Sequence, residues 1–413
     1  NYKIKKKIIM AKSLFISYDG LMEPLGISQI LKYQERLAEN HTIFILSFEK
    51  PQDLQDVKKF DHLKSYVKNK GITWIPLKYH KKLSALATAY DIWQGIRVAS
   101  KLIKQHDIKI VHARSYVPSV MALSLKKKFG VKYIFDMRGY WADERIDGGI
   151  WDKEKFFYRQ LYNLAKWFEK RFLLNADVVV SLTHAAIEDM KTFSYLQGNL
   201  PKFECVTTCA DLNTFTLPDA VKIKKKNRSD FVLGYVGSVG TWYLFDETLR
   251  VFQLLKSKIP NAKFVIYNRG DHDFIRARML ALKIDSNSVT LKSGSHQVVA
   301  KAMQMMHAAA FFIKCAYSKK ASSPTRLGEF LGCGVPCLVN EGVGDMANIV
   351  KQNQVGVSVN QFDDQTLKEA VDNLIALVNV EGIAVRCRDV AEAQFSLNDG
   401  VDHFNRIYHE LDS

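Results

Sequence analysis

Short apolar segments of strand length alternate with helix-length amphipathic stretches along most of the chain, and this alternation restricts the fold more than any other feature. In the first half, the expected strands are Lys12–Tyr18, His41–Phe48, Ile72–Leu77, Ile108–Arg114, Lys132–Arg138 and Asp177–Leu182. The expected helices cover 28–39, 83–106, a stretch ending at 128, and 153–174, with a loop rich in aromatic and acidic residues before the last. The pattern predicts a doubly wound α/β domain with a parallel sheet covered on both faces.

A second alternating set begins at Phe231. Its expected strands cover 231–236, 262–267, 289–292, 309–314 and 336–340, and its expected helices 245–258, 271–282, 296–307 and 324–331. Between the two sets the periodicity is lost, and a basic run occupies 222–228. We therefore predict two Rossmann-like domains, 1–200 and 229–394, joined by a linker over 201–228, with a helix over about 395–413 packing back on the first. Ligands of such folds bind outside the carboxyl ends of the strands, so two facing domains would form a cleft.

Composition excludes several classes of protein. A hydrophobic content of 47% and a charged content of 25% are those of a chain that buries a large core rather than a disordered one. No apolar run reaches the roughly 18 residues that a membrane-spanning helix needs. The six cysteines lack the two-residue spacing of zinc or redox motifs, so we expect free thiols in a reducing compartment. With no cleavage-site pattern after the lysine-rich 1–12, we expect a cytoplasmic protein.

Charge is distributed unevenly. Residues 1–200 hold 34 Lys and Arg against 20 Asp and Glu, whereas residues 201–413 hold 25 against 23. The excess predicts that the first half meets an acidic partner, for which anionic lipid headgroups, a phosphorylated acceptor and nucleic acid each qualify. The alternative is a solvated basic surface without a partner.

The segment Ala321–Asn340 carries the most chemical information. Ser323 is a good N-cap with Pro324 just inside a helix, so the amides near Thr325 and Arg326 would offer an anion the positive end of the helix dipole. The spacing places Thr325, Arg326 and Glu329 on one helix face. Such a face would hold a nucleoside diphosphate, with Glu329 accepting hydrogen bonds from the ribose. The alternative is an ordinary capped helix with a surface Arg–Glu pair.

These residues also carry a family resemblance. Pro-Thr-Arg-Leu-Gly-Glu at 324–329 resembles the signature of the retaining GT-B glycosyltransferases of family 4 (group 1). GYVGSVGTWY (234–243) resembles the glycine turn that opens their donor domain, and TCADLNTF (208–215) their interdomain segment. Three further segments resemble a bacterial surface-polysaccharide subset: 17–29, 111–118 and 135–144. The resemblance implies transfer of a sugar from a nucleotide-diphosphate sugar to a hydroxyl acceptor, a glycan or lipid-linked saccharide, with retention and without a cofactor or metal.

The chain departs from the family pattern at two places. Family members commonly carry a first glutamate near the position that Ala321 occupies here. They also place Arg and Lys just after the glycine turn, whereas here Ser238 follows Gly237. We therefore expect Arg326 to be the leading phosphate-binding cation and Arg269 the second candidate, with Gly237, Ser238, Thr325 and Glu329 completing the donor side.

Candidate residues in the first half lie at strand ends. His112 corresponds by resemblance to a histidine that touches the donor sugar; otherwise it is a hydrogen-bonded strand-end histidine. Asp136 would orient the acceptor hydroxyl or accept its proton, unless Arg138 only neutralises the acids around it. Gly26, in the loop after the first strand, would let the backbone approach a ligand.

The helix expected over 153–174 combines a stripe of large apolar residues with basic residues around it. The stripe consists of Phe157, Leu161, Leu164, Phe168 and Phe172. Such a stripe is usually core. The other interpretation is an amphipathic face resting on lipid, in keeping with a peripheral position at the inner face of the cell membrane.

Other classes of protein stay open or are disfavoured. A nucleotide-sugar epimerase and a catalytically silent sugar-nucleotide-binding relative are alternatives, the second because of Ala321. A nicotinamide oxidoreductase is disfavoured because the three-glycine fingerprint is missing. Nucleic acid is not expected as a partner, because no helix-turn-helix, zinc or aromatic RNA-binding motif is present. The acidic pair Asp271 and Asp273 is too weak a motif to predict a metal site.

Overall fold

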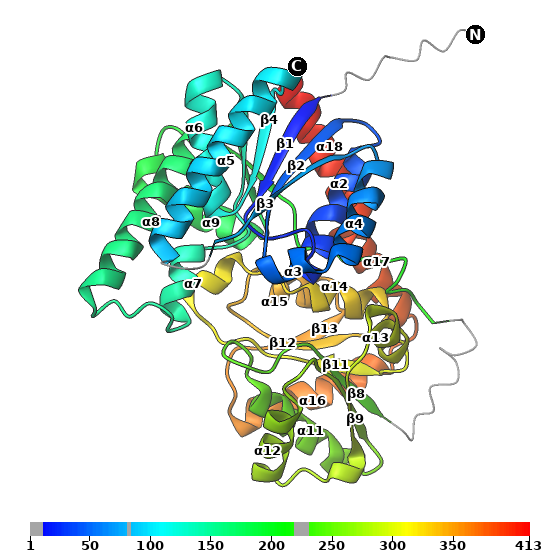
Figure 1. Ribbon diagram of the computed structural model, residues 1–413. Coiled ribbons are helices and arrows are strands. Elements are labelled where there is room, and N and C mark those ends of the chain that lie inside the picture. The colour runs from blue at the N-terminus through cyan, green and yellow to red at the C-terminus, as the bar shows by residue number, and fades with distance from the viewer. Residues whose placement is uncertain (1–10, 81–83, 219–230) are drawn as a thin grey trace, which may run out of the picture. The chain divides into compact units, whose positions relative to one another are not determined.

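The computed structural model describes residues 11–80, 84–218 and 231–413, and these divide into two compact units (Figure 1). The N-terminal unit comprises the described residues up to Val206 together with Gly400–Ser413, and the C-terminal unit runs from Thr207 to Asp399. The basic run 222–228 lies outside the described residues. The predicted domain limits stay a prediction.

The N-terminal unit is built on one parallel sheet in the order β3-β2-β1-β4-β5-β6-β7. Its strands are β1 (Lys12–Ser17), β2 (Thr42–Glu49), β3 (Thr73–Lys78), β4 (Ile110–Arg114), β5 (Lys132–Asp136), β6 (Val178–Ser181) and β7 (Lys202–Cys205). Its helices are α1 (Pro24–Gly26), η1 (Ile27–Leu31), α2 (Lys32–Leu37), α3 (Pro51–Gln55), α4 (Val57–Asn69), α5 (Ser84–His106), α6 (Tyr116–Phe129), α7 (Trp141–Asp147), α8 (Phe156–Asn175), α9 (His184–Lys191) and η2 (Ser194–Leu196). The strand order reverses between β1 and β4, which places a ligand-binding crevice at the carboxyl ends of these two strands.

The C-terminal unit contains a second parallel sheet, in the order β10-β9-β8-β11-β12-β13. Its strands are β8 (Val232–Val236), β9 (Lys263–Tyr267), β10 (Val289–Lys292), β11 (Ala308–Ala310), β12 (Cys337–Asn340) and β13 (Gly356–Val359). Its helices are α11 (Phe245–Lys258), α12 (His272–Ala281), η3 (Ser286–Ser288), α13 (His296–Met303), η4 (Tyr317–Ala321), α14 (Thr325–Gly332), α15 (Met346–Gln352), α16 (Asp364–Val378) and α17 (Ile383–Phe395); α18 (Leu397–Asp412) follows and lies mostly in the N-terminal unit. The reversal here lies between β8 and β11.

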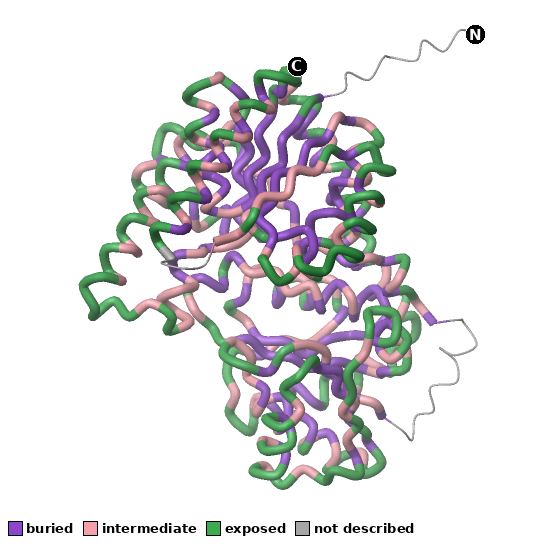
Figure 2. The backbone as a smooth tube through the Cα atoms, in the orientation of Figure 1, coloured by how far each residue is buried: buried purple, intermediate pink, exposed green. Residues whose placement is uncertain are grey.

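Buried strands form the centre of each unit, as Figure 2 shows by colour. All residues of β4 and β12 are buried, as expected for parallel strands covered on both faces. The two doubly wound α/β sheets confirm the predicted fold class. Among the described residues, none of the helices combines the length and the apolar character that a bilayer span requires.

Several elements differ from the sequence predictions; strand β13 and helices α9, α15, α16 and α17 have no counterpart in them. Helix α4 was not predicted, although Asp56 caps it by accepting a hydrogen bond from the Lys59 amide at 3.1 Å. Residues 141–147 form α7 where a loop was expected. Strand β7 lies inside the segment predicted to be linker, and it pairs with β6 as the edge of the sheet.

Candidate functional site

The turn after β8 is held in a conformation that requires glycine. Gly237 has φ +121°, a value that side chains rarely allow. Its amide donates to the Tyr267 carbonyl at 2.9 Å, and its carbonyl accepts from the Asn268 amide nitrogen Nδ2 at 2.9 Å. The buried Asn268 also accepts from the Asp271 amide at 2.7 Å. The turn is thus fixed to the end of β9, as the predicted glycine loop requires.

Arg326 lies directly beside this turn. A Cβ atom at Gly237 would collide with its guanidinium group. The guanidinium carbon lies 4.4 Å from the ring centroid of Tyr243 and 5.4 Å from that of Tyr235. The Arg326 side chain is about nine-tenths buried, and its Nη1 atom has no hydrogen-bond partner among the described residues. Aromatic faces offset only part of the cost of burying this charge.

The start of α14 differs in detail from the prediction. The helix begins at Thr325 with Pro324 as N-cap, and no side chain caps it. Ser323, predicted as the cap, instead shares a 2.5 Å hydrogen bond between its Oγ and the Thr207 Oγ1. The prediction was wrong because Pro324 has extended backbone, which moves the cap one residue along the chain. The first amides of α14 are therefore not used by a capping side chain.

Glu329 lies one turn deeper in α14. Burial raises the pKa of its carboxyl to about 7, although the positive charge of Arg326 acts in the opposite direction. Within the part of the chain that the structure describes, no hydrogen bond to this carboxylate is formed. Arg326 is thus buried and Glu329 half-buried at the pocket, and the hydrogen-bonding capacity of both groups is largely unused.

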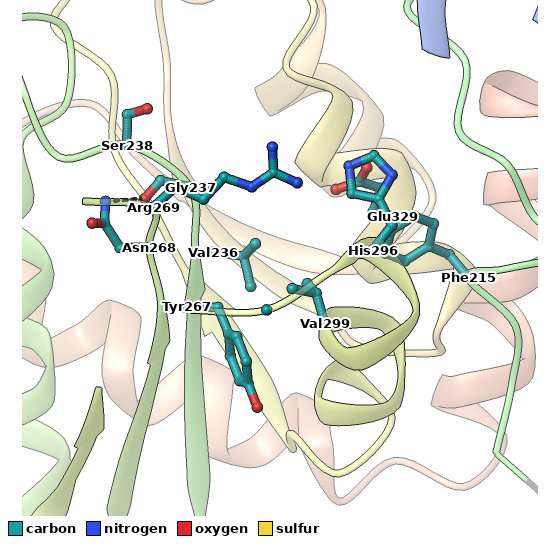
Figure 3. A pocket seen from close by; sticks show the side chains of 11 residues that line it. Phe215, Val236, Gly237, Ser238, Tyr267, Asn268, Arg269, His296, Val299 and Glu329 are labelled. Atoms are coloured by element: carbon teal, nitrogen blue, oxygen red, sulfur yellow. Dashed lines mark hydrogen bonds between the residues drawn. The ribbon is translucent and has the colours of Figure 1, made fainter. Parts of the chain in front are cut away.

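A pocket of about 180 Å³ opens at the carboxyl ends of β8 and β9. Eleven residues line it: Phe215, Val236, Gly237, Ser238, Tyr267, Asn268, Arg269, Gly294, His296, Val299 and Glu329 (Figure 3). Figure 3 shows the Arg269 guanidinium extending into this space toward Glu329 and His296. Partial burial and the charge of Arg269 lower the pKa of His296, which favours a neutral imidazole. The pocket brings together four of the predicted donor-side residues.

Sequence reasoning missed several lining residues. Asn268 follows β9 directly and His296 begins α13, so both stand at positions where ligands meet such sheets. Phe215 lies in the segment noted only for its family resemblance. Ala321, at the end of η4, is 2% exposed, so packing fills the place of the family's glutamate.

The N-terminal unit gathers a second group of charges at the ends of β4 and β5. His112 Nε2, Arg114 Nη1 and Arg138 Nη1 lie 3.7, 3.7 and 3.8 Å from the Asp136 carboxylate oxygens. His112 Nδ1 makes a 2.9 Å hydrogen bond with the Tyr408 hydroxyl. The structure therefore brings the three predicted residues together, and it adds Arg114 and Tyr408.

Electrostatics fix the ionisation of this cluster. Burial alone would raise the pKa of Asp136, but Arg138, His112 and Arg114 outweigh it and hold that pKa below its usual value. Burial lowers the pKa of His112, so the imidazole is neutral at pH 7. Burial, with help from Arg138, lowers the pKa of Arg114 to about 10. Arg138 has φ +55°, a strained conformation that is most often found where function demands it.

Gly26 has a structural explanation in the fold. Its backbone is helical, and a Cβ atom would collide with the Gly20 carbonyl oxygen and approach Leu21. The preceding loop is held by the fully buried Glu49, which accepts hydrogen bonds from the Leu21 and Met22 amides at 2.8 and 3.1 Å. The close approach at Gly26 is to the chain's own backbone, and its expected role beside a ligand stays a prediction.

Among residues 11–80, 84–218 and 231–413, no three His, Cys, Asp or Glu side chains lie close enough together to hold a metal ion. The expectation that catalysis needs no metal stays a prediction.

In comparisons with known proteins, each half of the chain matches a family of glycosyltransferases. Residues 29–197 match the description Glycosyltransferase Family 4, and residues 218–381 match Glycosyl transferases group 1. A search of curated proteins finds no match to the sequence.

Solved structures resemble the whole chain at low sequence identity. Sucrose-phosphate synthase from Thermosynechococcus elongatus is 13% identical, with a TM-score of 0.68 over 97% of this chain and 99% of that one. Anabaena HepE, solved with UDP, is 14% identical, with a TM-score of 0.65 over 97% and 100%. WaaG, a glycosyltransferase of lipopolysaccharide biosynthesis, is 16% identical, with a TM-score of 0.63 over 96% and 99%.

Proposed function

Because the chain belongs to the GT-B glycosyltransferases, with a family 4 and a group 1 domain, we propose that it transfers a sugar from a nucleotide-diphosphate sugar to a hydroxyl acceptor with retention of configuration. One observation carries the donor assignment. The buried Arg326 guanidinium lies beside the Gly237 turn with an unpartnered Nη1, next to a pocket lined by Glu329. An anion at this turn would supply the missing counter-charge.

The diphosphate binds at the Gly237–Ser238 turn and the start of α14, where Arg326 and the first amides of the helix face it. Arg269 extends into the pocket as a second cation. Glu329 accepts hydrogen bonds from the ribose hydroxyls. The pocket volume of about 180 Å³ suits a nucleobase and part of a ribose rather than a whole nucleotide sugar.

In the reaction, the bond between the anomeric carbon and the diphosphate oxygen breaks and the nucleoside diphosphate leaves. The acceptor oxygen forms the new bond on the same face of the sugar. Negative charge develops on the leaving diphosphate, and Arg326 and the helix amides stabilise it. The acceptor proton passes to the departing phosphate oxygen, so atoms and charges balance.

Asp136 orients the acceptor hydroxyl in this scheme. A carboxylate whose pKa is held below its usual value by two arginines is a poor proton acceptor but a good hydrogen-bond acceptor. Neutral His112, with its Nε2 atom unpartnered among the described residues, offers a hydrogen bond to the donor sugar.

Uridine is the base we propose, because HepE was solved with UDP, with UDP and glucose, and with UDP-glucose. The test measures the affinity of UDP, GDP, ADP and TDP by calorimetry for the protein and for Glu329→Ala. We expect UDP to bind most tightly and the variant to lose at least tenfold in affinity. Unchanged binding by the variant would remove Glu329 from the site.

A catalytically silent relative is the second candidate, because Ala321 stands where the family has a glutamate. It would bind UDP-sugar without releasing UDP when acceptors are added. Measurement of UDP release with a panel of hydroxyl acceptors separates the two.

A further inference from the structure

One face of the N-terminal sheet is covered by three helices whose outer surfaces have an unusual composition. Helices α5, α6 and α8 lie together on one side of this sheet, and α2, α4 and α18 on the other (Figure 1). The contacts of α6 with both α5 and α8 make the first group a continuous layer. We call its outer surface the α5–α8 face.

Acidic groups are missing from the α5–α8 face. The three helices contain three, three and four Lys and Arg, ten in all, and only two carboxylates, Asp91 and Glu169. Both carboxylates are fully buried. Asp91 accepts hydrogen bonds from Tyr18 and His80, and Glu169 from Tyr116 and Lys166. Lys126 pairs with Asp177, just after α8, and Lys166 pairs with Glu169 and with Asp143 of α7. The other eight basic side chains of this layer form no ion pair with an acid among the described residues.

The opposite face lacks this asymmetry. Helices α2 and α4 and the 400–412 part of α18 carry seven Lys and Arg against five Asp and Glu. The excess positive charge that the sequence shows for its first half is thus concentrated, among the helices of the sheet, on one side.

Exposed aromatic side chains gather on the same face. Within the described part of the N-terminal unit, all exposed aromatic residues lie on α5 or α8: Tyr90, Trp93, Phe156, Phe157 and Trp167. Trp93 is 54% exposed and Trp167 47% exposed. Water-exposed tryptophan is costly, so a cluster of such residues indicates a surface that becomes covered.

Apolar and basic residues are ordered along each helix. On α5, Leu86, Tyr90 and Trp93 share one stripe with Arg97 and Lys101. On α8, Phe157, Leu164 and Trp167 precede Lys170 and Arg171. Arg97 stacks on Trp93 and Arg171 on Trp167, with guanidinium-to-centroid distances of 5.6 and 3.9 Å.

Both helices run antiparallel to the strands. The N-terminal half of each helix, which holds most of its exposed apolar residues, therefore lies at the carboxyl edge of the sheet. This is the edge at which β4 ends at Arg114 and β5 at Asp136. Aromatic rings flanked by Lys and Arg, without acids, match the interface of a bilayer, where rings enter the headgroup region and cations meet lipid phosphates.

We propose that the α5–α8 face docks on an anionic lipid bilayer. The inference goes beyond the proposed sugar transfer and does not depend on it. It commits to lipid because a nucleic-acid surface would use the charge but leave Leu86, Phe157 and Leu164 unexplained.

The test uses the full chain with vesicles of phosphatidylcholine alone or mixed with phosphatidylglycerol, at low and at physiological salt. Flotation measures the bound fraction, and tryptophan fluorescence reports whether the rings leave water. We expect binding to the anionic vesicles only, a blue shift on binding, and a loss of affinity at higher salt.

Two pairs of variants identify the face. Arg97→Glu with Lys101→Glu reverses two charges four residues apart on α5, and Lys64→Glu with Lys68→Glu makes the same change on α4. We expect the α5 pair to weaken vesicle binding at least tenfold and the α4 pair to change it less than threefold. Trp93→Ala with Trp167→Ala should abolish the blue shift and weaken binding about tenfold or more.

Thermal unfolding followed by circular dichroism, measured for every variant, shows that each is folded, whether or not the proposed donor binds. Equal losses for the α4 and α5 pairs would overturn the proposal, and so would absence of binding to anionic vesicles at low salt. Binding of duplex DNA but not of vesicles would overturn it in favour of a nucleic-acid surface.

Discussion

The two units differ in whether their charged side chains in the interior have counter-charges. In the N-terminal unit, Asp136 lies between Arg114 and Arg138 with His112 beside it, so each charge has a counter-charge within about 4 Å. In the C-terminal unit, the buried Arg326 and the half-buried Glu329 leave much of their hydrogen-bonding capacity unused. The first arrangement is balanced in charge without a ligand, although Asp136 Oδ1 and His112 Nε2 have no hydrogen-bond partner among the described residues, whereas the second needs a ligand to supply its counter-charge.

This difference predicts whether the loss of a charged group lowers the stability of the fold or the affinity for a ligand. Removing a partner from a charge-balanced cluster leaves an uncompensated charge in the interior, so the fold becomes less stable. Removing a cation that has no counter-ion relieves a desolvation cost, so the fold is spared and ligand binding suffers instead.

The largest effect is expected from Asp136→Asn. Arg114 and Arg138 would stay buried without a carboxylate, at a cost of about 3–5 kcal/mol in the free energy of unfolding. Urea denaturation measures it. Asp19→Asn is the control, because Asp19 is half exposed and its loss should cost less than about 1 kcal/mol. Equal effects of the two substitutions would break the comparison.

Arg326→Met should weaken ligand binding rather than the fold. We expect the affinity for UDP to fall by about a hundredfold, which corresponds to about 2.8 kcal/mol. The free energy of unfolding without ligand should stay unchanged or increase, because Arg326 forms no ion pair among the described residues and Glu329 can take up a proton when the neighbouring cation is lost. Calorimetry and urea denaturation measure the two quantities, and a destabilised variant with normal UDP affinity would contradict the assignment.

Glu329 makes stability depend on pH. Its pKa is raised to about 7 in the folded protein, so the folded state holds this proton more tightly than the unfolded state, and stability falls as pH rises through this range. Between pH 5.5 and 8 the loss should reach about 2 kcal/mol, at about 1.4 kcal/mol per pKa unit. Glu329→Gln should remove this component. If the wild type and the variant lose stability in parallel, the carboxylate is not buried as described.

The same group should report donor binding. Ribose hydroxyls that donate to the carboxylate would lower the pKa of Glu329, so UDP binding near pH 7 should release part of a proton. Calorimetry in two buffers of different ionisation enthalpy detects it, and Glu329→Gln should show no such release.

The smallest effect concerns the glycine turn. Gly237→Ala places a side chain at φ +121° and against the Arg326 guanidinium, so we expect a loss of about 1–2 kcal/mol in stability and a similar loss in UDP binding. Gly240→Ala is the matched control, because open space surrounds Gly240. Comparable losses in both variants would show that the position of Gly237 is not special.

Local patterns predicted much of the fold and part of the sites. Strands such as Ile110–Arg114 could be predicted because parallel strands covered on both faces are apolar throughout. Helix Val57–Asn69 was missed because only Leu63 and Val67 of it are buried, which leaves a weak apolar stripe. The cap at Ser323 was predicted wrongly because side-chain preference says nothing of the backbone angle at Pro324.

Contacts between residues far apart in the sequence could not be predicted. Arg326 was predicted as a phosphate-binding cation, but no pattern predicted that it is buried against Gly237, Tyr235 and Tyr243, which lie more than eighty residues earlier in the chain. Tyr408 bonds to His112 across a separation of 296 residues. No spacing rule in one sequence connects such pairs.

The contact between Tyr408 and His112 has a consequence for folding during synthesis on the ribosome. Residues 400–413 complete the N-terminal unit, yet the ribosome produces them after all of Thr207–Asp399. Tyr33 packs on Phe404 and His41 bonds to Asn405, so a nascent chain lacking this segment leaves part of its first sheet bare. The unit that is synthesised first is therefore finished last, and until then it exposes apolar surface that favours aggregation.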